Sequence, residues 1–235
     1  MTADAIVLVA GMSTRIRSLT QGLPKSFLKV GDESLIGRTL RLLRGAGVET
    51  ITLVTGFEAD VFRDAFPECN FVHNPDFATT NTSVSLSLAL NARKDDKVAE
   101  DKTVMVVNGD VYYAEGILQD MLAKSEHTLA AVKRHDLSEE EVKVIVEGDR
   151  IKRIGKHLDD RFAYGEAFGI YQLNPRFQRY MRQELNVMGN RKIFYEEAMD
   201  RLLGGGHDVR LHDVGDAIVQ EIDFVEDYES LKKRV

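Results

Sequence analysis

The sequence has one cysteine, fewer basic than acidic residues, and no hydrophobic run long enough to cross a membrane. Cys69 alone cannot form an internal disulfide, so we expect a cytoplasmic protein. The apolar run at residues 5–10 is too short for a membrane span. With 31 Lys and Arg against 38 Asp and Glu, the net charge of −7 disfavours a nucleic-acid partner, because phosphate backbones are held by clustered basic side chains. What remains is an ordinary globular composition, 43% hydrophobic and 29% charged.

The charge is unevenly distributed along the chain. Residues 5–31 contain no acidic side chain but include Arg15, Arg17, Lys25 and Lys29. The rest of the chain is therefore more acidic than the net charge indicates. A local positive segment on an acidic chain predicts a site for a small polyanion.

Short apolar runs alternate with helical patterns in the first half of the chain, which is typical of parallel βαβ units. We expect strands at 6–9, 50–54, 71–72 and 103–107, and helices from Ser34 to about Gly45, at 60–66 and at 83–93. Further strands are expected at 129–133, 142–147, 150–154, 165–173, 209–214 and near 218, with helices at 175–187, 193–203 and 225–233. The prediction is a single α/β domain over residues 1–235. It has an open, mostly parallel twisted sheet with helices on both faces and a mixed C-terminal half.

The loop after the first strand, Ala10-Gly11-Met12-Ser13-Thr14-Arg15, leaves the strand where open α/β sheets bind ligands. Its small residues let backbone N–H groups approach phosphate oxygens, and Arg15 adds a forked donor. The loop is not a dinucleotide fingerprint, because Ser13 stands where the second glycine would be. It is not a P-loop either, since Lys25 is too far along the chain.

The continuation of this loop resembles the N-terminal signature of the sugar-nucleotidyltransferase superfamily, A-G-x-G-[ST]-R-x-x-P-x-T-x-x-x-P-K. The residues that match are Ala10, Gly11, Thr14, Arg15, Thr20, Pro24 and Lys25. Ser13 replaces the second glycine of that pattern and Ser18 its first proline. Asn108-Gly109-Asp110 and the 221–228 segment are similar to the family's metal-binding and C-terminal motifs. Shorter stretches near 81–86, 140–144, 154–156, 165–170 and 195–198 resemble the choline-phosphate cytidylyltransferase-like group.

The resemblance implies a Rossmann-like nucleotidyltransferase fold and nucleotidyl transfer, in which an acceptor phosphate oxygen attacks the α-phosphorus of a nucleoside triphosphate and pyrophosphate leaves. We expect Mg²⁺ as the cofactor, held by Asp110 and Asp223, since Mg²⁺ takes one or two carboxylates together with substrate phosphates. Other readings of these two residues are a turn for Asp110 and the N-cap of the last helix for Asp223. Glu221 is a plausible neighbour of this pair but is expected at the surface.

The remaining candidates fall into groups by role. Lys25 and Arg15 are assigned to the triphosphate, Lys25 also bridging toward the acceptor phosphate; the alternative is a solvated basic pair. The loop Ala10, Gly11, Met12, Ser13 and Thr14, together with Asn81, Ser85 and Gly109, is assigned to the nucleotide, with Asn81 reading the base or starting a helix. Lys156, Glu166 and Tyr195 are assigned to the acceptor: Lys156 to its phosphate, Glu166 to a cationic group and Tyr195 to a cation–π contact. The alternatives are surface for Lys156 and core for the aromatic ring.

The predicted function is a CTP-dependent cytidylyltransferase acting on a small phosphoryl or phosphonyl acceptor. Phosphocholine leads, followed by amino-phosphonates, phosphorylated amino-acid derivatives and inositol 1-phosphate. Three rivals stay open: a hexose 1-phosphate uridylyl- or thymidylyltransferase, a binding protein without turnover, and a glycosyltransferase, which would need a D-x-D motif that residues 108–110 lack. The six histidines show no zinc-site spacing, and a homo-oligomer is left open.

Overall fold

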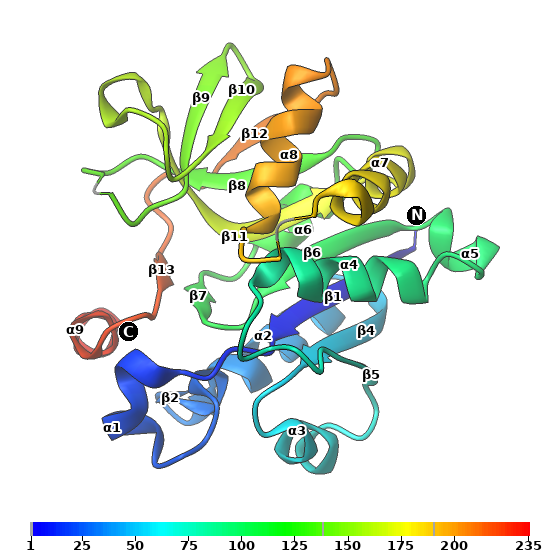
Figure 1. Cartoon of the computed structure of the whole chain (residues 1–235). Helices are drawn as coiled ribbons and strands as arrows, with labels where there is room; N and C mark the ends of the chain where they lie inside the picture. Colours follow the sequence, from blue (N-terminus) through cyan, green and yellow to red (C-terminus); the bar gives the residue numbers. More distant parts are fainter. Residues whose placement is uncertain (1, 138, 190) are drawn as a thin grey trace.

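One nine-stranded sheet organises the computed structural model, which describes residues 2–137, 139–189 and 191–235 (Figure 1). The sheet order is β5-β4-β1-β6-β11-β8-β12-β10-β9. Its strands are β1 (Ala3–Val9), β4 (Val48–Thr55), β5 (Asn70–His73), β6 (Thr103–Asn108), β8 (Leu129–Lys133), β9 (Lys143–Glu147), β10 (Arg150–Gly155), β11 (Gly165–Leu173) and β12 (Arg210–Asp213). β4, β1, β5 and β6 are parallel, and β11 enters antiparallel to β6. The predicted parallel first half and mixed second half are confirmed.

Helices cover both faces of this sheet (Figure 1). They are α1 (Arg17–Thr20), α2 (Leu35–Gly45), α3 (Ala59–Ala65), α4 (Thr82–Ala92), α5 (Lys97–Glu100), α6 (Ile117–Leu122), α7 (Pro175–Val187), α8 (Tyr195–Gly204) and α9 (Val225–Lys232). Short 3₁₀ turns are η1 (Thr14–Ile16), η2 (Lys25–Phe27) and η3 (Asp160–Phe162). The bounds of α7 agree with the predicted ones at both ends.

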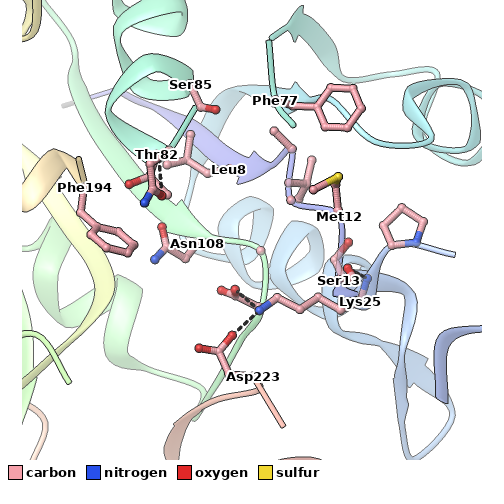
Figure 2. A pocket seen from close by; sticks show the side chains of 18 of the residues that line it. Leu8, Met12, Ser13, Lys25, Phe77, Thr82, Ser85, Asn108, Phe194 and Asp223 are labelled. Atoms are coloured by element: carbon pink, nitrogen blue, oxygen red, sulfur yellow. Dashed lines mark hydrogen bonds and ion pairs between the residues drawn. The ribbon is translucent and has the colours of Figure 1, made fainter. Parts of the chain in front are cut away.

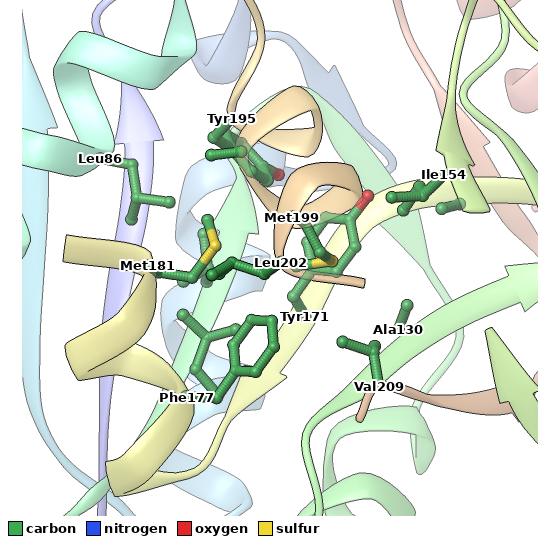
Figure 3. Close-up of a cluster of buried hydrophobic side chains, with 14 of the residues drawn as sticks. Leu86, Ala130, Ile154, Tyr171, Phe177, Met181, Tyr195, Met199, Leu202 and Val209 are labelled. Carbon is green, nitrogen blue, oxygen red and sulfur yellow. The ribbon is translucent and has the colours of Figure 1, made fainter. Parts of the chain in front are cut away.

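The two faces of β1 belong to different cores, because successive strand side chains point to opposite sides. Ile6 and Leu8 pack with α4, α7 and α8, in the cluster that includes Phe177, Met181 and Tyr195 (Figure 3). Val7 and Val9, with Ala5, pack with α2, α3 and α6 on the other face. The continuous apolar runs of the sequence therefore mark strands that are buried on both sides.

Local sequence signals account for several element ends. Ser34 is the N-cap of α2, and its hydroxyl accepts a hydrogen bond from the backbone N–H of Gly37. Gly148-Asp149 joins β9 and β10 as a tight hairpin, with Gly148 at a φ of 63°. Sequence patterns missed α6 and the small hairpin of β2 (Lys29–Val30) and β3 (Glu33–Ser34), which are short and carry little periodicity.

A second, two-stranded sheet brings the end of the chain to the carboxyl edge of the main sheet. β7 (Val111–Tyr113) pairs antiparallel with β13 (Val219–Glu221), and the backbone N–H of Ile222 donates to the carbonyl of Asp110 at 3.0 Å. A third apolar cluster, which contains Ile16, Leu28, Ile222 and Leu231, joins the N-terminal segment to α9. Figure 1 shows α1 and α9 side by side, so the two ends of the chain frame the same edge.

The part of the chain that the structure describes contains no helix long and apolar enough to span a membrane.

The close contact of β1 and β6 at Gly109 yields a stability prediction. A Cβ on Gly109 would lie 2.4 Å from Val9 Cγ1 and 3.0 Å from the Leu8 carbonyl oxygen, so we expect Gly109→Ala to lower the free energy of unfolding by about 1–3 kcal/mol. Gly45→Ala in α2 is the matched control, because its Cβ meets nothing within 4 Å among the described residues. Chemical denaturation of both variants checks this; equal stability of the two would contradict it.

Candidate active site

A cavity of about 450 Å³ opens at the carboxyl ends of β1 and β6, where the chain order of the sheet reverses (Figure 2). Figure 2 places Phe194 and Asn108 on one side of it and Met12 and Phe77 on the other. Of the fifteen residues assigned to the site from the sequence, thirteen line it: Ala10, Gly11, Met12, Ser13, Thr14, Arg15, Lys25, Asn81, Ser85, Gly109, Asp110, Lys156 and Asp223. Its size is that of a small-ligand site.

Ser13 has the backbone conformation that normally favours glycine. Its φ of 55° and ψ of 32° are left-handed, so the serine keeps the conformation expected of the glycine it replaces. Its hydroxyl oxygen accepts a hydrogen bond from the backbone N–H of Lys25 at 2.7 Å. The loop after β1 is thereby tied to the segment that carries the lysine.

The ammonium of Lys25 lies between two carboxylates at the centre of the cavity. Its Nζ is 2.7 Å from Asp110 Oδ2 and 2.5 Å from Asp223 Oδ1. Arg15 approaches the other oxygen of Asp223 at 3.7 Å and stacks over the Phe224 ring. Residues 198 positions apart thus meet at one point, which the pairing of β7 with β13 makes possible.

The charges of this cluster depend on one another. Burial opposes the charged form of Lys25, but Asp110 and Asp223 outweigh it and raise its pKa well above the usual value. Burial also opposes ionisation of Asp223, and Lys25 and Arg15 outweigh it, so the pKa of Asp223 is lowered. Burial raises the pKa of Glu221, and the negative charges of Asp110 and Asp223 raise it further. Glu221 also lines the cavity, so the expectation that it lies at the surface is wrong.

Asp110 and Asp223 suit a magnesium ion, because both are carboxylates and both point to the same place in the cavity. Both reach the same ammonium, and Asp110 Oδ1 is buried without a hydrogen-bond partner among the described residues. A protein usually supplies one or two carboxylate ligands to a Mg²⁺ ion. Residues 2–137, 139–189 and 191–235 contain no group of three or more His, Cys, Asp or Glu arranged for a metal. A cation here would take its other ligands from substrate phosphates and water.

The proposed base-reading residues lie at the start of α4. Asn81 is the N-cap of α4, and its Oδ1 accepts a hydrogen bond from the backbone N–H of Thr82 at 2.8 Å. Asn81 therefore starts a helix, as the alternative reading held, and it also lines the cavity, so its role in reading the base stays a prediction. Because its oxygen is used by the cap, its amide nitrogen is the group left for a ligand. The buried Asn74 donates to the hydroxyl of Ser85 at 3.1 Å and fixes that side chain.

The wall formed by the start of α8 is acidic. Glu196 is buried, accepts a hydrogen bond from the Tyr171 hydroxyl at 3.1 Å, and its burial raises its pKa to about 7. Lys156 lies over the Phe194 ring at 4.8 Å and is 3.8 Å from Glu140. Glu196, Lys156 and Phe194 all line the cavity.

Two residues assigned to the acceptor do not line the cavity. The Glu166 carboxylate is buried at 2.6 Å from His135 Nε2. Burial raises the pKa of Glu166, although the contact with His135 opposes this. Tyr195 is fully buried against Tyr171, and its hydroxyl donates to Asn108 Oδ1 at 3.1 Å. Tyr195 is thus a core residue that orients Asn108, as the alternative reading held.

Sequence reasoning missed several lining residues. Asn108 directly follows the apolar run of β6, and Glu196 stands beside Tyr195 in a stretch that was noted, so both lay one residue from an assigned position. Asn74, Phe77, Thr82 and Phe194 also line the cavity. They come from loops and helix starts, where no spacing rule indicated a ligand.

The open α/β sheet carries a loop of small residues, a central lysine and a carboxylate pair at its carboxyl edge, and this arrangement suits the transfer of a nucleotidyl group. The model of the MobA-like NTP transferase domain matches residues 5–166. The chain therefore belongs to this family, and it is a nucleotidyltransferase enzyme.

Named relatives agree with this class. The chain is 27% identical over 93% of its length to the CMP-5'-(3-aminopropyl)phosphonate synthase of Streptomyces rubellomurinus, of which it spans only 36%. It is 24% identical over 94% of its length to the 2-aminoethylphosphonate cytidylyltransferase of Lancefieldella rimae, covering 89% of that protein. The structure of the CTP:phosphocholine cytidylyltransferase from Streptococcus pneumoniae aligns with a TM-score of 0.82 at 19% identity, over 100% of this chain and 99% of that one, and shows the fold.

The hydrogen bond of Ser13 predicts an order of stability for two variants. Ser13→Ala loses the bond to Lys25 and keeps the left-handed backbone, so we expect its free energy of unfolding to fall by about 1 kcal/mol. Ser13→Gly loses the same bond but relieves about 1 kcal/mol of left-handed strain, and should be close to the wild type. Urea denaturation measures both; an alanine variant as stable as the wild type would refute the contribution of the bond.

Proposed function

We propose that the chain is a Mg²⁺-dependent, CTP-using cytidylyltransferase that transfers CMP to a small phosphonate or phosphate bearing a cationic amine. The observation that carries this proposal is the meeting of Lys25 with Asp110 and Asp223, between a basic loop and an acidic wall. The relatives' names support the acceptor class, since one is a synthase of CMP-5'-(3-aminopropyl)phosphonate and another a 2-aminoethylphosphonate cytidylyltransferase.

The two ends of the cavity suit the two substrates. In the proposed complex, the backbone of residues 10–14 and the side chains of Arg15 and Lys25 hold the triphosphate, and the Asn81 amide and Ser85 contact the base. Lys156 pairs with the acceptor's phosphonate, and the carboxylates of Glu196 and Glu221 face its ammonium group. The acceptor is thus oriented by opposite charges at its two ends.

The reaction is a displacement at phosphorus. A phosphonate oxygen of the acceptor forms a bond to the α-phosphorus, the bond from that phosphorus to the bridging oxygen breaks, and pyrophosphate leaves. Lys25 stabilises the negative charge that grows on the phosphoryl oxygens, and Arg15 that on the leaving group. Asp110 and Asp223 would hold Mg²⁺, which when bound neutralises triphosphate charge. The chain's main contribution is to position two anions against each other.

A substrate matrix tests the proposal. Pyrophosphate release is measured with CTP, UTP, dTTP and GTP against 2-aminoethylphosphonate, 3-aminopropylphosphonate, phosphocholine, inositol 1-phosphate and glucose 1-phosphate. We expect CTP with an amine-bearing acceptor to give the highest kcat/KM. Preference for UTP or dTTP with glucose 1-phosphate would instead identify a sugar-nucleotide enzyme.

Asp110→Asn should lower kcat with Mg²⁺ by at least about 100-fold, roughly 2.7 kcal/mol, because it removes one of the two proposed carboxylate ligands. Asp120→Asn, the same change at an exposed position of α6, is the control and should leave kcat unchanged. Full activity of the Asp110 variant would show that this carboxylate does not hold the metal.

The raised pKa of Glu196 predicts how acceptor binding varies with pH. Only the ionised carboxylate attracts an ammonium group, and burial raises its pKa to about 7, so the KM for the acceptor should fall as pH rises through that value. The groups that face Glu196 are Tyr171, Tyr195 and Lys156, and Lys156 favours the ionised form.

Glu196→Gln should raise this KM and remove its pH dependence. Glu197→Gln makes the same change at the next residue of α8, away from the cavity, and should behave as the wild type. The KM is measured with 2-aminoethylphosphonate between about pH 6 and pH 8, one unit on either side of that pKa. If the KM of the Glu196 variant varies with pH as that of the wild type does, the pH dependence comes from the acceptor's own phosphonate and not from Glu196.

A further inference from the structure

The position that two carboxylates prepare for a cation is filled by a side chain of the protein itself. The Lys25 ammonium is within 2.7 Å of one oxygen from each of Asp110 and Asp223, and its side chain is only 19% exposed. Glu221 adds a third acidic group to the same cluster. With no substrate bound, Lys25 supplies the positive charge that these acids need.

A tethered cation competes strongly with a free one. Lys25 begins η2 directly after Pro24, and the Ser13 hydroxyl fixes its backbone N–H, so its ammonium is confined close to the carboxylates. A tether of this kind gives a high effective concentration. A divalent ion that enters between Asp110 and Asp223 must first displace this ammonium, because both cations need the space between the two carboxylates and the same negative charge.

Triphosphate offers Lys25 another partner. Lys25 and the loop at residues 10–14 line the same cavity, so phosphates held by that loop would lie close to the Lys25 side chain. When Lys25 pairs with phosphate, the two carboxylates lose their cation and attract a new one. Nucleotide and divalent cation then favour each other's binding to the same degree, as linkage requires.

We propose that Lys25 acts as an internal competitor of the divalent cation, so that the free enzyme binds the cation weakly and nucleotide opens the Asp110–Asp223 pair to it. This second role of the lysine rests on the proposed function, because it assumes that the pair is the cation site. It makes the order of binding a property of the chain.

Lys25→Met tests the proposal, since methionine keeps an unbranched side chain and removes the charge. Mn²⁺ is titrated into the nucleotide-free protein, and free Mn²⁺ is followed by electron paramagnetic resonance. We expect the variant to bind Mn²⁺ at least about tenfold more tightly than the wild type. Its melting temperature should be lower without Mn²⁺ and should rise more on adding it, because the unpaired carboxylates then regain a cation.

Matched variants show whether the tighter Mn²⁺ binding comes from removing the Lys25 charge beside the two carboxylates. Lys29→Met removes a charge from the same basic segment at an exposed site and should bind Mn²⁺ as the wild type does. The double variant Lys25→Met with Asp110→Asn should lose the gain. Lys25→Gln is the second single variant if the methionine protein does not fold, with the same expected direction.

The outcomes separate this proposal from the proposed function. If the Lys25 variants bind Mn²⁺ no more tightly than the wild type while the wild type turns over CTP with Mg²⁺, the competition is refuted and the cytidylyltransferase function stands. If neither wild type nor variant binds Mn²⁺ and no CTP turnover occurs with any acceptor, both proposals fail.

Discussion

The contact of one ammonium with two carboxylates is the interaction on which this active site depends. Lys25 comes from the N-terminal segment, Asp110 from the turn between β6 and β7, and Asp223 from beyond β13. They meet because β13 pairs with β7 and because Ile16 and Leu28 share a buried cluster with Ile222. Burial of these apolar side chains brings the N-terminal and C-terminal segments together, and this contact holds the charged groups close to one another.

The same contact segregates charge within one cavity. Arg15 and Lys25 come from the N-terminal segment, whereas Glu196 and Glu221 belong to elements from the C-terminal half. Neither glutamate is held by a lysine or arginine as firmly as Asp223 is, and burial raises the pKa of both. A site with this imbalance favours a ligand that carries its own positive charge, and an aminoalkyl phosphonate carries a positive and a negative end at a short separation.

The sheet was predictable because its strands are buried on both faces and therefore form unbroken apolar runs, such as 103–107. β7 and α6 were missed because three and six residues give too little periodicity to recognise. Arg15 and Lys25, which the N-terminal motif singled out, both line the cavity, and a motif of residues close in sequence can indicate such a position. Glu221 was misplaced because its exposure depends on the β7–β13 pairing, a contact between residues about 110 positions apart. Glu166 was assigned to the acceptor without knowledge of His135, its partner in the fold.

Ser13 shows what the sequence pattern at this loop requires. A motif can require glycine because there is no space for a side chain or because the backbone is left-handed. In the first case any side chain clashes, and in the second a side chain costs only backbone strain. Here the backbone is left-handed, so conformation is the requirement, and serine meets it at a small cost in strain. Its hydroxyl accepts the Lys25 N–H, and the loop thereby gains a tie to the lysine that glycine cannot make. The departure from the family pattern therefore keeps the shape of the loop and adds a link between the loop after β1 and the lysine at the centre of the site.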